Sequence, residues 1–254
     1  MRRLIIEEPY SKAALLSQRL AVFSLLVAGF GLWGVHRGRD LLVVLASSVV
    51  VACMAILFAL LAFVIIWGTG RRGASQAFGG LLLATVLLSY PAYLLAQSLT
   101  LPRLTDIATD LADPPSFSLS RGAFAARGGG LPPELPMASR RAQLKAYPQI
   151  QPILLDLDAP DAFDAALWAA KSNGWQIIEE RPAGDRSSLW HIDAIASSFI
   201  LGFPHDITIR LRPLAGQTRL DIRSVSRLQT LDLGTNPRNI TNFEDALRSI
   251  VDKK

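Results

Sequence analysis

The densest group of side chains that could do chemistry lies in residues 221–236, where charged, hydroxyl and amide groups follow one another closely. Side chains alternate between the two faces of a strand, so Asp221, Arg223 and Arg227 should share one face. Arg210 and Arg212 would then lie opposite them on the neighbouring strand. Guanidinium groups and carboxylates arranged in this way either pair with each other or bind an anion. The candidate site residues are Asp221, Arg223, Ser224, Ser226, Arg227, Asp232 and Asn236.

Two interpretations of this group stay open. In the first, arginines and carboxylates form a lattice of ion pairs that fixes the strand register. The nearest carboxylates in the sequence, Asp221 and Asp232, are then the expected partners of Arg223 and Arg227. In the second, the guanidinium groups, the serine hydroxyls and a helix beginning at Asn236 converge on a phosphate or carboxylate ligand. Neither interpretation predicts a catalytic residue.

Signatures of known enzyme classes are missing from the sequence. It contains no Gly-x-Ser-x-Gly motif, no phosphate-binding glycine loop and no His-Glu-x-x-His motif. His191-x-Asp193 and His205-Asp206 could supply metal ligands, but their spacing is unconstrained and no cysteine accompanies them. We therefore predict no metal and no cofactor. The alternative is a hydrolase-type enzyme, which needs a concave pocket where His191, Asp193 and the Arg–Asp group converge.

Elements that could position these groups are visible between residues 151 and 254. Alternating or β-type runs predict strands at 175–181, 188–195, 207–212 and 219–223, with a short apolar run at 153–157. Apolar stripes at helical spacing predict one helix between Asp158 and Gly174, and a closing helix after Asn236-Pro237. This order predicts a small α+β domain with an antiparallel sheet of about four strands and two amphipathic helices.

Residues 102–150 lack a strong hydrophobic period, and they contain seven prolines and the triplet Gly128-Gly129-Gly130. We expect them to form a connecting segment between residues 1–101 and the domain at 151–254. This segment is either a spacer or a cover laid over the domain that follows.

Residues 1–101 are predicted to form three transmembrane helices. Residues 41–67 carry no charge over 27 positions, and residues 77–101 carry none over 25. Both runs exceed the roughly 20 apolar residues that a helix needs to cross a bilayer. Residues 15–35 form a shorter candidate that spans if Arg19 snorkels to the interface. The second and third spans hold no ionisable residue, which argues against a transporter.

The charge distribution indicates a membrane orientation rather than nucleic-acid binding. Residues 1–101 hold eight Lys and Arg against three Asp and Glu, whereas residues 102–254 hold 18 of each. The short segments around the three spans place more basic residues on the side of the N-terminus, which predicts a cytoplasmic N-terminus and an exported C-terminal domain. The expected location is a bacterial inner membrane with the domain in the periplasm. Cys53, the only cysteine, lies in the second span.

Motifs of the C-terminal half resemble the domain of unknown function 1499 family of bacterial and plastid proteins, over about residues 105–250. The most specific motifs are Asp-x-Arg-Ser-x-Ser-Arg at 221–227 and Asp-x-Gly-x-Asn at 232–236. Typical members carry Lys-Asp-Asp where this chain has Pro204-His205-Asp206, and Gly where it has Gln229. The resemblance implies the domain, and the family name implies no activity. Supporting motifs are Asp-Pro-Pro at 113–115, Ala-Tyr-Pro at 146–148, Gly-Trp at 174–175 and Gly-Phe at 202–203.

These observations together predict a membrane-anchored envelope protein with a non-catalytic extracytoplasmic module. Its expected partners are the lipid bilayer and either an envelope protein or an anionic small molecule, and nucleic acid is excluded because the excess basic charge lies beside the spans.

Overall fold

The computed structural model describes residues 8–37, 42–184, 189–198, 200–227 and 233–251. Asp232 and Gln229, which the sequence motifs include, lie outside the described residues. The chain divides into two compact units, residues 1–96 and 97–254, which are described separately below.

The N-terminal unit consists of long apolar helices, as the sequence predicts. These are α1 (Lys12–His36), α2 (Leu42–Thr69) and α3 (Ala74–Thr100). Each is long and apolar enough to cross a membrane. The first begins three residues earlier than expected and therefore includes Lys12. Pro91 lies inside α3 without ending it, as is tolerated in membrane helices.

Small side chains bring these three helices together. Ala21, Ala52, Ala55 and Ala84 are fully buried at their contact. Ser17 Oγ donates a hydrogen bond to the carbonyl oxygen of Ala55 at 2.9 Å. Large apolar side chains such as Val43, Leu57 and Trp67 of α2 are exposed instead. This distribution is typical of helices that pack through small residues and turn their bulky side chains toward lipid.

The C-terminal unit is built on one antiparallel sheet in the order β1-β6-β5-β4-β3, with β2 also paired to β6. The sheet has six strands, so the expectation of about four is wrong. The two strands beyond the expected four, β1 and β2, are each three residues long. Strand β2 lies in the short run noted at 153–157, whereas β1 lies within the proline-rich segment, where no strand was expected. The strands are β1 (Asp106–Ala108), β2 (Ile153–Leu155), β3 (Gln176–Arg181), β4 (Trp190–Ser197), β5 (Pro204–Leu214) and β6 (Gln217–Ser226).

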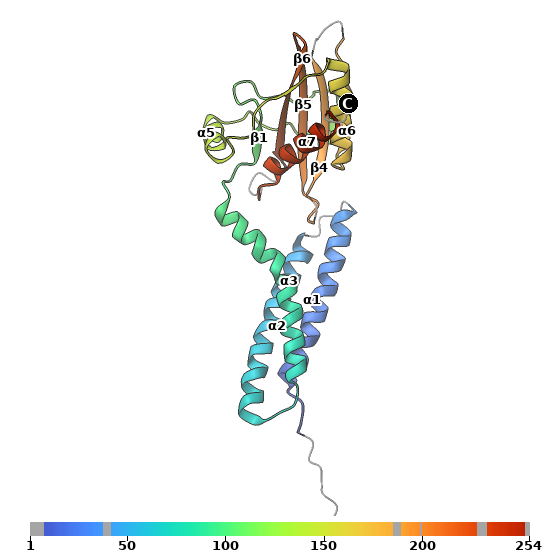
Figure 1. Cartoon of the computed structure of the whole chain (residues 1–254). Helices are drawn as coiled ribbons and strands as arrows, with labels where there is room; N and C mark the ends of the chain where they lie inside the picture. Colours follow the sequence, from blue (N-terminus) through green and yellow to red (C-terminus); the bar gives the residue numbers. More distant parts are fainter. Residues whose placement is uncertain (1–7, 38–41, 185–188, 199, 228–232, 252–254) are drawn as a thin grey trace, which may run out of the picture. The chain divides into compact units, whose positions relative to one another are not determined.

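Two amphipathic helices cover one face of this sheet (Figure 1), as predicted. They are α6 (Ala159–Ser172) and α7 (Thr235–Val251). The Asp158 side chain caps α6 by accepting from the Asp161 N–H at 3.1 Å. Helix α7 begins at Thr235, so Asn236 lies inside its first turn. The core beneath both helices includes Phe163, Ala166, Trp175, Ile192, Ile207, Ile209, Leu211, Leu220, Ile222, Ile240, Phe243 and Leu247.

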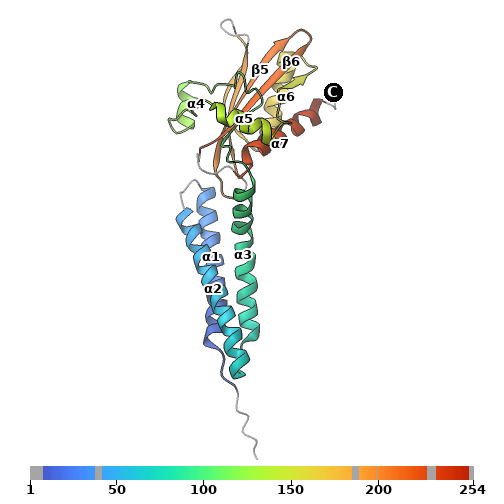
Figure 2. The same ribbon diagram turned by 90° about the vertical axis from the view of Figure 1, so that its left-hand side faces the viewer.

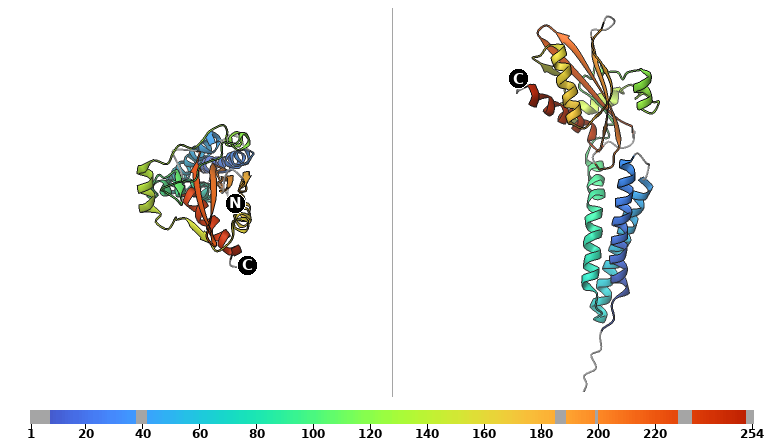
Figure 3. Two further views of the ribbon diagram at one scale, coloured as in Figure 1. Left: turned by 90° about the horizontal axis from the view of Figure 1, so that it is seen from above. Right: turned by 90° about the vertical axis from the view of Figure 1, so that its right-hand side faces the viewer.

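Residues 102–150 lie against the opposite face and the β1 edge, and they contain two short helices, α4 (Arg121–Ala126) and α5 (Met137–Ala146). Figure 2 shows α4 on the other side of the strands from α7, and Figure 1 shows α5 beyond β1. The right-hand view of Figure 3 shows α6 and α7 on one side of the strands and α4 on the other. Of the two roles expected for residues 102–150, the structure shows the second, a cover over the domain. These residues are called the covering segment below.

Candidate functional site

The polar face of the sheet is buried beneath residues 106–136. Asp193, Thr208, Arg210, Asp221 and Arg223 all point to this side, and each is buried. Strand alternation explains their placement, because the residues between them face the core under α6 and α7. Their partners come largely from the covering segment, which the sequence interpretation did not assign to the site.

Arg223 contacts two separate parts of the covering segment, at Asp106 and at Pro133. Its Nε donates to Asp106 Oδ1 at 2.9 Å and its Nη2 to Asp106 Oδ2 at 2.6 Å, which makes a bidentate pair. Nη2 also donates to the carbonyl oxygen of Pro133 at 2.7 Å. The guanidinium carbon atoms of Arg223 and Arg127 lie 5.4 and 5.5 Å from the centre of the Phe117 ring, within cation–π distance.

A second group of ion pairs joins β5 and β6 to the first part of the covering segment. Arg210 contacts Asp221 and Asp113, each at 2.9 Å. Arg219 contacts Asp110 at 2.5 Å and Asp221 at 3.0 Å. The Asp110 side chain also accepts the backbone N–H groups of residues 112 and 113, which shapes the local turn. Three carboxylates and two arginines are therefore paired with one another, although Arg210 Nε is buried without a described hydrogen-bond partner.

Asp193 on β4 is the centre of a third group. Arg127 Nη1 lies 2.7 Å from its Oδ2, and the Ser118 N–H donates to the same oxygen at 2.9 Å. His191 Nε2 lies 2.9 Å from Oδ1, within ion-pair distance but outside hydrogen-bond geometry. Burial alone would raise the pKa of Asp193, but the contact with His191 and the Ser118 N–H outweigh it, so the pKa is lowered.

Arg227 pairs with Asp206, whereas its expected partner Asp232 lies outside the described residues. Its Nε lies 3.1 Å from both carboxylate oxygens, and its Nη2 donates to Oδ1 at 2.8 Å. Its side chain is 28% exposed, whereas that of Asp206 is 6% exposed. Arg223 pairs with Asp106 instead of the expected Asp221, because the covering segment brings a carboxylate from a distant part of the chain against it.

Ser224, Ser226 and Asn236 form a separate network on the other face of β6. Asn236 Oδ1 accepts from Ser224 Oγ at 2.7 Å, and Asn236 Nδ2 donates to Ser226 Oγ at 2.9 Å and to the Thr105 carbonyl oxygen at 3.0 Å. His205 Nδ1 lies 3.1 Å from Asn236 Oδ1 and 3.0 Å from Ser226 Oγ. Burial lowers the pKa of His205, although the Asn236 contact opposes this. The hydroxyls and the guanidinium groups therefore do not converge.

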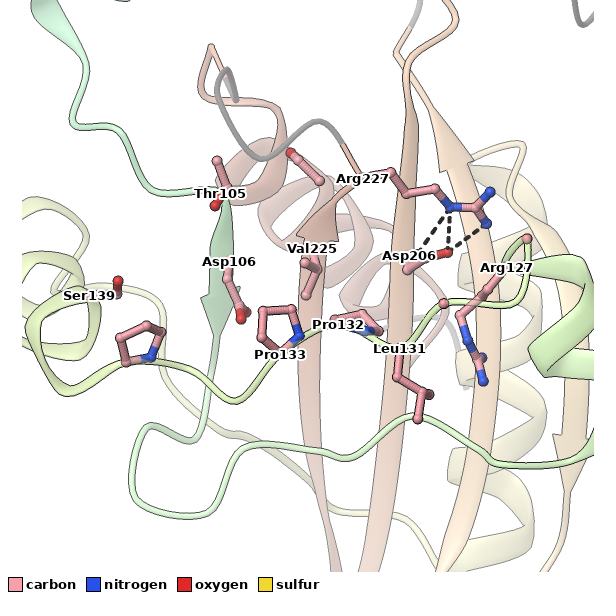
Figure 4. Close-up of a pocket in the computed structure, with 14 residues that line it drawn as sticks. Thr105, Asp106, Arg127, Leu131, Pro132, Pro133, Ser139, Asp206, Val225 and Arg227 are labelled. Atoms are coloured by element: carbon pink, nitrogen blue, oxygen red, sulfur yellow. Dashed lines mark hydrogen bonds and ion pairs between the residues drawn. The ribbon is translucent and has the colours of Figure 1, made fainter.

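A pocket of about 430 Å³ opens beside β1 and the end of β6 (Figure 4). One wall is formed by apolar and glycine residues of the covering segment, and the other by strand residues that include the Arg227–Asp206 pair. His191 and Asp193 are not among its lining residues. Sequence reasoning missed this pocket because most of its wall has no periodic pattern. The lining residues are Thr105, Asp106, Arg127, Gly128, Gly130, Leu131, Pro132, Pro133, Pro136, Ser139, Asp206, Val225, Ser226 and Arg227.

Comparison with known proteins identifies the domain. No curated protein matches the sequence. A family model described as "Protein of unknown function (DUF1499)" matches residues 106–247, more than half of the chain. The match runs from β1 to α7, so it includes the covering segment as well as the sheet. The chain therefore belongs to the DUF1499 family, which is described as of unknown function.

Proposed function

We propose that this protein is a membrane-anchored binding module without catalytic activity, whose pocket beside β1 takes a ligand or a segment of an envelope partner. The observation that carries the proposal is the mutual pairing of the charged groups on the polar face. Arg210, Arg219 and Arg223 each contact carboxylates of the same domain. Charged groups held in this way stabilise the fold and are poorly placed to take part in a reaction.

The pocket suits an uncharged ligand better than an anion. Two of its lining residues are arginines, but Arg127 is bound to Asp193 and Arg227 to Asp206. The charge of each guanidinium group is therefore already balanced by a carboxylate of the same domain. The volume of about 430 Å³ lies in the range of small-molecule sites, and its apolar walls are typical of them.

The alternative function, a hydrolase-type enzyme, is not supported by the position of its expected residues. It requires His191 and Asp193 to converge in a concave site, but both are buried under the covering segment. Among the described residues, no group of three or more His, Cys, Asp or Glu side chains could hold a metal ion.

The proposed location is a bacterial inner membrane, with the N-terminus in the cytoplasm and the C-terminal unit in the periplasm. The three apolar helices and the basic residues near the N-terminal side support it. A C-terminal alkaline phosphatase fusion should be active and a C-terminal green fluorescent fusion dark. The opposite pair of results would refute the orientation.

Binding is tested with the full chain in detergent micelles. A library of small fragments is screened by ligand-observed magnetic resonance against the wild type and against Ser139→Trp, which fills the pocket from one wall. Ala142→Trp is the matched control, because Ala142 is exposed on the same helix and does not line the pocket. Fragments that bind the wild type and the control but not Ser139→Trp support the proposal. A library without any such fragment contradicts it.

A further inference from the structure

Two residues of β1, Asp106 and Ala108, direct their backbone N–H and C=O to the outer edge of the sheet. Among the described residues, only the groups of Ala108 have hydrogen-bond partners there. Ser226 donates to the Thr105 carbonyl oxygen at 2.8 Å, and Thr109 donates to the Ile222 carbonyl oxygen at 2.9 Å. In an antiparallel pair, alternate residues direct their N–H and C=O toward the partner strand. The backbone groups of Asp106 and Ala108 therefore point away from β6, toward α5.

At Ala108, the chain fills this edge with a side-chain amide. Gln143 of α5 accepts the Ala108 N–H at 3.1 Å and donates to the Ala108 carbonyl oxygen at 2.7 Å. A carboxamide here occupies the place of a further strand. Gln143 is 1% exposed, so the contact is built into the fold.

At Asp106, two residues earlier on the same edge, no described hydrogen bond uses the backbone N–H or C=O. The residue of α5 one turn before Gln143 is Ser139, which shares its face because the two are four residues apart. Serine is too short to repeat the Gln143 contact. Figure 4 shows Ser139 across from Asp106, and both line the pocket.

We propose that this pocket binds one residue of an extended apolar peptide, whose N–H and C=O pair with the backbone of Asp106 as the Gln143 side chain pairs with Ala108. The two groups belong to the same residue but to different peptide bonds, because in an extended chain the N–H and C=O of one residue point to the same side. The ligand N–H donates to the Asp106 carbonyl oxygen, and the ligand carbonyl accepts the Asp106 N–H. Leu131, Pro133 and Pro136 line the same pocket and offer apolar surface to the groups beside the amide. The inference rests on the proposed binding function and names the ligand class of that site.

The first test compares three probes on the full chain in detergent. N-acetyl-leucine N-methylamide carries the N–H and C=O of one apolar residue, and 2-acetoxy-4-methylpentanoic acid N-methylamide replaces that N–H with an ester oxygen. Loss of one net hydrogen bond of about 1 kcal/mol should weaken binding about fivefold. N-acetylglucosamine presents the same amide on a polar ring and should bind more weakly than the amide probe. Equal affinity for the amide and the ester would overturn the pairing, and tighter binding of the sugar would overturn the peptide assignment.

The second test uses Ser139→Gln, which supplies the missing amide from α5 itself. It should abolish binding of the amide probe and slow hydrogen exchange at the Asp106 N–H, followed by mass spectrometry of overlapping peptides. Ala142→Gln adds the same side chain on the exposed face and should change neither quantity. Unchanged exchange and unchanged binding in Ser139→Gln would refute the geometry.

The two proposals fail in different ways. If the library yields fragments that Ser139→Trp excludes but the amide has no advantage over the ester, only the peptide inference fails. If no fragment depends on the pocket, the binding function itself fails.

Discussion

Removing the guanidinium group of Arg223 should destabilise the C-terminal unit more than any change at an exposed arginine. Arg223→Met keeps the length of the side chain but leaves the Asp106 carboxylate without its bidentate partner. Both side chains are buried, at 7% and 10% exposed. The carbonyl oxygen of Pro133 also loses its donor. Breaking a buried ion pair on one side costs about 3–5 kcal/mol, because the remaining charge stays desolvated.

The cost corresponds to a fall of about 10 °C in melting temperature for a unit of this size, at about 2–4 °C per kcal/mol. The melt is followed by tryptophan fluorescence of the full chain in detergent, since Trp175 stacks on Phe243 in the core with ring centres 5.4 Å apart. Arg248→Met is the matched control. Its pair with Glu244 on α7 is largely exposed, and such pairs contribute about 0.5 kcal/mol.

A second variant separates loss of the pair from general damage. Arg223→Met combined with Asp106→Leu removes both charges, and replacing a buried pair with apolar groups is often neutral. The double variant should therefore recover much of the lost stability. The anion-site interpretation predicts the reverse pattern, in which Arg223→Met melts like the wild type and phosphate stabilises the wild type alone. That pattern would refute the structural role of Arg223.

Three further predictions follow from the fold and the buried histidine. A fragment beginning at Arg103 should fold alone and melt cooperatively by circular dichroism, because both helical stripes and the whole sheet lie within it; a non-cooperative melt would contradict the boundary. The lowered pKa of His205 means that the unfolded chain binds a proton near the ordinary value of 6.5 before the folded one does. Urea unfolding should therefore show stability falling as pH drops below that value, by up to about 1.4 kcal/mol per pH unit, and His205→Gln should flatten this dependence. The same pH dependence of unfolding free energy in His205→Gln and the wild type would refute the role of His205. Gly80→Leu should disrupt the contact of α3 with α1, because an added Cβ would meet the Ser17 backbone at 2.8 Å, whereas Gly79→Leu meets only Gln18 at 3.8 Å. Equal melting of these two variants in detergent would contradict the helix packing.

Local patterns were sufficient to predict the elements that dominate each unit. The uncharged runs predicted three membrane-length helices, because a bilayer imposes length and apolarity on every span. Helical spacing predicted α6 and α7, and alternation predicted the strands from β3 to β6, because each of these elements buries one face. The faces of Asp221 and Arg223 followed from the same alternation.

The partners of these side chains could not be predicted from local patterns. Asp106 is 117 residues from Arg223 in the sequence, and Asp113 is 97 residues from Arg210. The sequence interpretation paired the arginines with neighbouring carboxylates because it had no means of placing the covering segment. It also grouped Ser224 and Ser226 with the arginines, although alternation places them on the opposite face of β6.

By itself, the sequence determined where apolar surface must be buried, since hydrophobic periodicity is a local property that every helix or strand carries. It therefore specified the three long apolar helices, the two core helices and the longer strands. Only the tertiary structure decided the polar site, because its parts are short or aperiodic and acquire their positions from contacts with the finished sheet. Strand β1, the turn at Asp110 and the Gln143 amide at the β1 edge are held by hydrogen bonds and ion pairs to distant residues. The same holds for the pocket beside β1, where α5 brings Ser139 to the wall that also contains Asp106.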